Sequence, residues 1–264
     1  TDNDYGNGMP SRCQAFKVSS REFDVKAGLE GDTVVAEYSL ASGNIFTVRY
    51  TLLEGGILSV ESDFKGVKSS KPVDVPRIGF RMRLPASADS FTYLGRGPEE
   101  NYADRFGGTL IGEYSSSASK EYVRYVRPQE CGHHIDCEYL SIGGLAIRSD
   151  RFEFNALRCA VEDLDSEEAV QRDYQWENKG PLTENDPAKA KNRLRRQTHI
   201  NDYVERDFVE VCVDYAQSGV GGYDSWAARP DGDRCLWSDR DYSFRFAIVP
   251  ARAMGVRKSL GFDF

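Results

Sequence analysis

The sequence predicts an all-β fold, a sandwich of antiparallel sheets. Apolar and polar residues alternate with a period of two in several segments, and turn-forming residues separate these segments. The chain also contains 24 glycines and 10 prolines among many short apolar runs. Successive side chains of a strand point to opposite faces, so this period is typical of half-buried strands. Repeated strand and turn signals favour two packed antiparallel sheets.

The first clear strand is predicted over Ile45–Leu53, with Thr47, Arg49 and Thr51 on its polar face. The turn Glu54–Gly56 follows, so the next strand is expected to form a hairpin with it. The remaining segments predict strands by the same alternation. The residues expected to face the core are Phe46, Val48, Tyr50, Leu52, Leu58, Val60, Phe64, Phe80, Met82, Leu84, Phe152, Phe154, Ala156, Tyr242, Phe244, Phe246 and Ile248, and Phe208–Tyr215 is a further apolar strand.

Three segments are not predicted to be strands. Thr1–Cys13 is polar and rich in turn residues, Val161–Val170 is an acidic run that predicts one short surface helix, and Asp173–Arg196 reads as an extended loop or insertion. No linker divides the chain, so residues 1–264 are predicted to form a single β-sandwich domain. Its abrupt start predicts an excised piece that lacks its first strand or strands.

Charge and hydropathy limit the partners. The net charge of −8 and the pI near 5.1 argue against nucleic acid and anionic membranes, which require a basic face. No apolar run approaches 18 residues and no signal-peptide pattern opens the chain, so we predict a soluble protein. The sequence leaves the compartment open between cytoplasm and periplasm.

Six cysteines are scattered without a Cys-x-x-Cys pair, which favours buried free thiols over disulfides. Cys131 and Cys137 flank His133 and His134 and invite comparison with a zinc site. Their spacing does not fit a zinc motif, and a structural site needs four ligands. No metal site is predicted.

The segment Gly219–Trp226 is the strongest functional signal in the chain. It follows the apolar strand Phe208–Tyr215, and its three glycines allow sharp turns with positive φ. Asp224 and Ser225 are able to bond the local backbone. Trp226 either projects from this loop as a platform for a sugar or packs beneath its own loop, and the segment by itself allows both arrangements.

Two other segments concentrate charged and titratable side chains. Gly95–Arg105 carries Arg96, Glu99, Glu100, Asp104 and Arg105, which fit either an ion-pair network or a set of catalytic carboxylates. The first interpretation is preferred. The second segment holds His133 and His134, which are able to act as general acids or bases but lack a nucleophile motif nearby. A role in structural hydrogen bonding is favoured for both.

Three motifs occur in one order along the chain: Gly95–Arg105, Tyr125–Glu130 and Gly221–Trp226. Together with the opening Thr1–Asp4 and the segments Pro76–Gly79 and Phe154–Leu157, they resemble the C-terminal domain of glycoside hydrolase family 2 β-galactosidases. The resemblance covers nearly the whole chain. It implies a galactose-mutarotase-like supersandwich that forms the fifth domain, or the small subunit, of a larger enzyme.

The resemblance also implies a division of labour. In the family, the catalytic glutamates belong to a TIM barrel that this chain lacks, so the chain alone is expected to be inactive. No cofactor is expected in this domain, because the magnesium and sodium sites of the family lie on other domains. Its expected partners are those domains and a β-galactoside such as galactose or lactose. The implied substrate-binding residues are Trp226, Asp224 and Gly222, with Asp2, Asn3, Asp4, Glu100, Asn101 and His134 as supporting residues.

The resemblance is incomplete at two places: Asp173–Arg196 is longer than in the best-known members, and the histidines after Gly132 are not fixed in the family. Two alternative functions therefore stay open. A free-standing aldose 1-epimerase would need His134 or His199 beside a carboxylate in a cleft. A carbohydrate-binding module would bind sugar without the rest of the enzyme.

Overall fold

The computed structural model describes residues 1–13, 16, 24–164, 200, 203–224 and 226–250. Within these ranges the chain is built almost entirely from antiparallel strands, as the alternation predicts. None of the helices among the described residues has the length and hydropathy needed to cross a lipid bilayer.

The strands are numbered along the chain. They are β1 (Asp24–Glu30), β2 (Thr33–Ser39), β3 (Ile45–Leu53), β4 (Ile57–Lys65), β5 (Asp74–Val75), β6 (Arg77–Pro85), β7 (Ser90–Gly97), β8 (Leu110–Ser117), β9 (His133–Ile142), β10 (Leu145–Leu157), β11 (Phe208–Gln217), β12 (Leu236–Trp237) and β13 (Tyr242–Pro250). Two short helices, α1 (Asp2–Gly6) and α2 (Met9–Arg12), precede them. Single turns of 3-10 helix occur at Glu54–Gly56, Ala86–Ala88, Val161–Leu164 and Gly232–Arg234.

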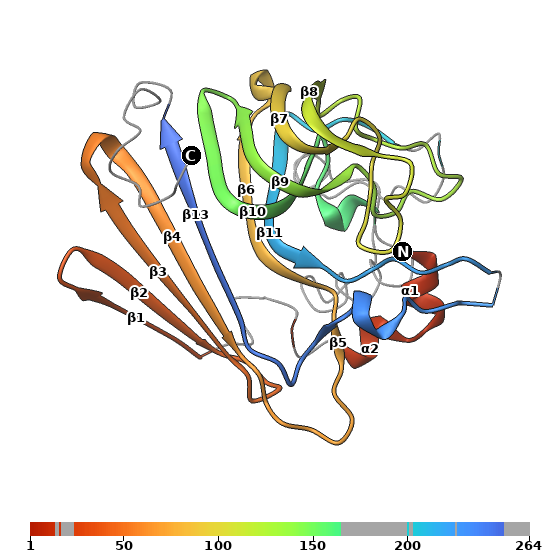
Figure 1. The fold of residues 1–264 in the computed structure, drawn as a ribbon, viewed down its shortest axis with the longest axis horizontal. Coiled ribbons are helices and arrows are strands. Elements are labelled where there is room, and N and C mark those ends of the chain that lie inside the picture. Colours follow the sequence, from red (N-terminus) through yellow and green to blue (C-terminus); the bar gives the residue numbers. More distant parts are fainter. Residues whose placement is uncertain (14–15, 17–23, 165–199, 201–202, 225, 251–264) are drawn as a thin grey trace, which may run out of the picture.

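Strand β10 joins two leaves of the main sheet. Its first part, Leu145–Arg148, pairs with β13, whereas its last part, Glu153–Leu157, pairs with β11. The pairing with β9 shifts register between Arg148 and Phe152, which is where the two leaves diverge. Leaf A has the order β1-β2-β3-β4-β13 and leaf B the order β8-β7-β9-β10-β11-β6. Figure 1 shows the leaves side by side, with leaf A at the left.

The core lies between the leaves, as expected for a sandwich. Phe80 of β6 meets Phe246 of β13 with ring centroids 5.2 Å apart, and Val60, Phe154 and Val211 belong to the same apolar cluster. The predicted hairpin at Glu54–Gly56 is confirmed by the pairing of β3 with β4. Leu52 departs from its predicted burial, because it lies at the end of β3 beside this turn and stays 68% exposed.

The helix prediction is correct only in part. Val161–Leu164 forms a turn of 3-10 helix, and the rest of Val161–Val170 lies outside the described residues, as does Asp173–Arg196. The N-terminal segment forms α1 and α2 rather than turns alone. Thr1 Oγ1 accepts a bond from the Asp4 N–H at 3.1 Å, a capping arrangement that opens α1. Gly8 then takes φ 71° as the N-cap of α2, and Pro10 lies in the first turn of that helix.

The segment between β11 and β12 extends away from the leaves and runs beside α1 (Figure 1). Its base is fixed by backbone bonds, from the Ser218 N–H to Pro76 O at 2.9 Å and from the Gly219 N–H to Arg234 O at 2.8 Å. All six cysteines are free and buried, as predicted.

Candidate functional site

Trp226 projects from the segment between β11 and β12 and is 90% exposed. We call residues 219–228 of this segment the Trp226 loop. The alternative that it packs beneath its own loop is therefore wrong. Tyr223, on the same loop, is 78% exposed. Large aromatic side chains are seldom this accessible, so the loop presents two rings to whatever lies beside it.

The loop is closed by its own hydrogen bonds. Asp224 Oδ1 accepts bonds from the N–H groups of Trp226 at 2.7 Å and Ala228 at 3.2 Å, and the Gly222 N–H donates to Ala228 O at 2.9 Å. Gly221 and Gly222 take φ 60° and 81°, which explains the glycines there. Ala227 also has a positive φ of 63°, a conformation that a side chain disfavours and that the surrounding bonds must maintain.

Two side chains from distant segments hold the two ends of this loop. Asn3 of α1 donates through Nδ2 to Val220 O at 3.1 Å and to Ala228 O at 2.6 Å. Asp104 accepts from the Val220 N–H at 3.0 Å through Oδ1 and from the Gly221 N–H at 2.7 Å through Oδ2. The structure thus brings Asn3, Asp224 and Gly222 close to Trp226, and adds Asp104.

Asp4, a second residue of the predicted N-terminal group, makes contacts within its own segment. Asp4 accepts a bond from Thr1 Oγ1 at 2.6 Å and completes the start of α1. Asp2 is the first residue of α1. Helix α1 bonds the Trp226 loop through Asn3 and also approaches it at Gly6, where a Cβ would lie 3.2 Å from the Ala227 Cβ.

Glu100 and Asn101 brace the turn after β7. Glu100 pairs with Arg105, contacts the Tyr125 hydroxyl and accepts the Gly132 N–H at 2.8 Å. Asn101 is fully buried, donating to Arg96 O and accepting from the Ile135 N–H at 2.8 Å. Arg96 pairs with Asp136 at 2.9 Å, and Glu99 is exposed. These contacts confirm the ion-pair interpretation for Glu100, Arg105 and Arg96.

His134 is buried among structural partners. Its Nε2 lies 2.9 Å from Glu121 Oε2, and its Nδ1 lies 3.1 Å from the Tyr93 hydroxyl. The ring has no exposed surface, so the structure supports the hydrogen-bonding interpretation. In the described part of the chain, no group of three or more His, Cys, Asp or Glu side chains is arranged to hold a metal ion.

The Trp226 loop therefore offers an apolar surface on a fixed backbone, while the charged residues nearby serve to hold it. An exposed indole of this kind is able to stack on the apolar face of a sugar.

The sequence matches the family described as beta galactosidase small chain over residues 1–248. The chain belongs to the beta-galactosidase small-chain family.

Individual relatives agree with this assignment. The chain is 30% identical over 262 residues to a beta-galactosidase of Priestia megaterium, 29% identical over 266 residues to one of Streptococcus thermophilus, and 26% identical over 261 residues to one of Lactobacillus delbrueckii subsp. bulgaricus. Each match covers 95% of this chain but only 22%, 23% and 23% of the relative. The chain thus corresponds to a minor part of these larger proteins.

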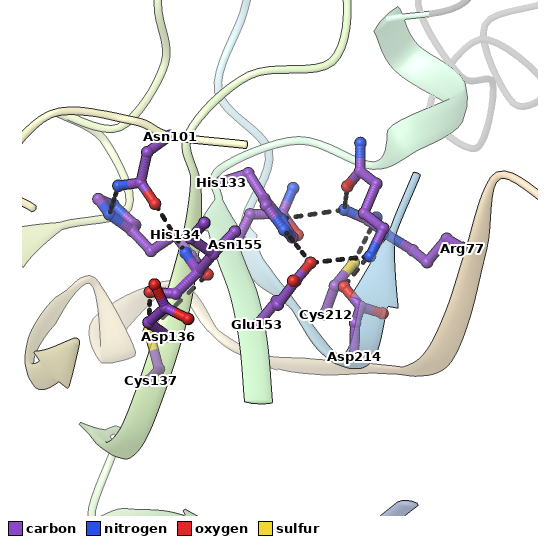
Figure 2. Close-up of polar contacts among 12 residues, drawn as sticks. Arg77, Asn101, His133, His134, Asp136, Cys137, Glu153, Asn155, Cys212 and Asp214 are labelled. Atoms are coloured by element: carbon purple, nitrogen blue, oxygen red, sulfur yellow. Dashed lines mark hydrogen bonds and ion pairs between the residues drawn. The ribbon is translucent and has the colours of Figure 1, made fainter. Parts of the chain in front are cut away.

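A second polar group in this small-chain domain escaped the sequence analysis. Arg77 of β6 lies between three strands, with its Nε 3.1 Å from Asp214 Oδ2 and its Nη2 3.3 Å from Glu130 Oε1. His133 Nε2 lies 3.0 Å from Glu153 Oε2, which also accepts the Gln217 N–H at 2.7 Å. We call Arg77, Glu130, His133, Glu153 and Asp214 the Arg77 cluster. Figure 2 labels four of its members, Arg77, His133, Glu153 and Asp214.

Burial dominates the electrostatics of the Arg77 cluster. It raises the pKa of Asp214 to about 8, against the opposing effect of Arg77, and it raises the pKa of Glu153 to about 7. Burial and the Arg77 charge lower the pKa of His133 well below its usual value. Within the described part of the chain, neither Asp214 carboxylate oxygen accepts a hydrogen bond of good geometry, although Arg77 Nε lies 3.1 Å from Oδ2.

The cluster escaped detection because its members come from four separated segments: β6, the start of β9 with the residues before it, β10 and β11. Arg77 and Glu130 lie in motifs that the sequence analysis named and His133 was discussed there, but no pattern in the sequence indicated that they meet Glu153 and Asp214. Asp104 was visible in its motif, but the loop it binds lies 116 residues away in the sequence.

Proposed function

We propose that this chain is a non-catalytic accessory domain of a β-galactosidase, in which Trp226 completes a galactoside pocket formed mainly by another domain. The observation that carries the proposal is the 90% exposure of Trp226 on a loop fixed from both sides. An exposed indole is stable in water only at the cost of hydrating its apolar faces, and a sugar ring or a neighbouring domain would remove that cost.

Family membership supports the accessory role. The chain corresponds to 22% of the Priestia megaterium beta-galactosidase, so a chain of that kind has ample room for a separate catalytic domain. A retaining glycosidase needs two carboxyl groups about 5–5.5 Å apart across the scissile bond. The carboxylates around the Trp226 loop do not supply them, because Asp104 and Asp224 are both engaged with backbone N–H groups.

The test is Trp226→Ala in the intact β-galactosidase that contains this chain. We expect KM for lactose to rise by about tenfold, which corresponds to about 1.4 kcal/mol of lost stacking, with a smaller change in kcat. A ring that contacts the ground state and the transition state alike stabilises both, so its loss weakens binding more than it slows the chemical step. Tyr223→Ala is the matched control, since it removes a second exposed ring from the same loop. Unchanged KM in the Trp226 variant would reject the proposal.

Two further measurements separate the alternative functions. Micromolar binding of lactose to this chain alone, measured by titration calorimetry, would favour a stand-alone carbohydrate-binding module. Accelerated mutarotation of fresh α-galactose, measured by polarimetry, would favour an aldose 1-epimerase. The buried position of His134 counts against the epimerase, and the other candidate, His199, lies outside the described residues.

A further inference from the structure

We propose that Asp104 and Asn3 are positioning residues for Trp226, forming a two-sided clamp that fixes where the indole stands relative to the bound galactoside. This inference rests on the proposed function and extends it to residues that do not touch the sugar. The clamp joins three segments of the chain: α1, the turn after β7 and the loop between β11 and β12.

The clamp grips one residue from both directions. The Val220 N–H donates to Asp104 Oδ1 while the Val220 carbonyl accepts from Asn3 Nδ2. Asn3 also donates to Ala228 O, so its single amide group connects Val220, near the start of the loop, with Ala228 at its end. Rotation of the loop as a body would break bonds to both side chains, which restricts the direction in which Trp226 points.

Two glycines of the loop leave the space that the clamping side chains occupy. A Cβ on Gly219 would lie 2.6 Å from Asp104 Cγ, and a Cβ on Gly221 would lie 2.8 Å from Asn3 Nδ2 and 2.3 Å from Ala228 O. Glycine at these two positions therefore allows the backbone to approach both clamping side chains. The positive φ of Ala227, next to Trp226, is a strained conformation that such a clamp would maintain.

The exposure of Asp104 argues that its role in the clamp is geometric, whereas Asn3 is half-buried. Asp104 is exposed, and hydrogen bonds made in contact with water add little to global stability. A carboxylate that accepts two adjacent N–H groups still fixes the orientation of the backbone that carries them, because both hydrogen bonds form in only one orientation of that backbone. Small displacements of a positioning group can cost large factors in activity even where stability is unchanged.

The experiment is a double-mutant cycle in the intact β-galactosidase with lactose as substrate. We expect Asp104→Ala and Asn3→Ala each to raise KM about threefold to tenfold with little change in kcat, and neither to exceed Trp226→Ala. In the Trp226→Ala background the same substitutions should change KM by less than about twofold, because the group they position is gone. Glu99→Ala, an exposed carboxylate in the same motif, is the matched control.

The outcomes separate this inference from the proposed function. If Trp226→Ala leaves KM unchanged, the proposed function fails. If Trp226→Ala raises KM but the clamp variants do not, or raise it equally in both backgrounds, the clamp is structural only and the inference is overturned. Asp104→Asn, which retains one acceptor oxygen, should lie between wild type and Asp104→Ala. It also serves if the alanine variant fails to fold.

Discussion

The Trp226 loop and the Arg77 cluster use the same kinds of side chain under opposite conditions of solvation. In the loop, Asp104 and Asp224 are exposed and accept backbone N–H groups, so their charge stays hydrated. In the cluster, Asp214 has no exposed surface and accepts no well-formed hydrogen bond from the described residues, and burial raises its pKa to about 8.

This difference in solvation predicts that the exposed carboxylates position the loop, whereas the buried ones affect the stability of the fold. An exposed carboxylate contributes direction at little cost, whereas a buried one carries a large desolvation penalty that its partners must offset. Substitutions in the cluster should therefore act mainly on the free energy of unfolding. Substitutions in the loop should act mainly on Trp226 and leave the fold intact.

The largest expected effect is that of Arg77→Met. Above pH 8, where Asp214 is ionised, removing the guanidinium leaves Asp214 and Glu130 without their cation, and loss of one partner of a buried pair typically costs about 3–5 kcal/mol. Urea unfolding followed by circular dichroism measures this. Arg49→Met is the control, because Arg49 pairs with Asp63 at the surface, where such pairs contribute about 0–1 kcal/mol. Equal losses in the two variants would contradict the comparison.

The next effect concerns pH. The folded state keeps the Asp214 proton up to about pH 8, whereas the unfolded chain loses it near 3.8, so the folded state binds more protons between these values. The free energy of unfolding should therefore fall as pH rises from 7 to 8, by up to about 1.4 kcal/mol per pH unit. Glu153, with a pKa near 7, acts in the same direction up to that pH. His133 opposes both below about pH 6.5.

Asp214→Asn should remove most of the decline above pH 7, which unfolding curves at a series of pH values would reveal. Asp241→Asn is the matched control: this carboxylate is at the surface, where Gly66 N–H and Lys65 lower its pKa. Its variant should keep the wild-type decline. A flat wild-type profile from pH 7 to 8 would show that Asp214 is ionised in the folded protein.

The smallest expected effect on stability is that of Asp224→Ala. It deletes the acceptor for the N–H groups of Trp226 and Ala228, yet these bonds are exposed, so the global free energy of unfolding should change by less than about 0.5 kcal/mol. Hydrogen exchange at the amides of residues 226 and 228 should nevertheless accelerate, because the local turn loses its closure. A loss above about 1 kcal/mol would place the loop within the cooperative fold.

Much of the sandwich could be predicted because alternation reports directly on which face of a strand is buried. Val48, Val60 and Phe246 are core residues as expected. Leu52 shows the limit, since the same pattern continues past the point at which burial ends. The two N-terminal helices were missed because Thr1 and Asp4 read as turn residues as readily as a cap.

The sequence by itself determined the strands, the glycine-rich loop with its tryptophan, and the family to which the chain belongs, because each is encoded in neighbouring residues or in motifs of fixed order. Only the tertiary structure decided that Trp226 is exposed, that Asp104 and Asn3 hold its loop, and that five dispersed residues form one buried charged cluster. Those facts depend on contacts between segments as far as 225 residues apart, and their strength depends on burial, which the chain acquires only when its leaves close together.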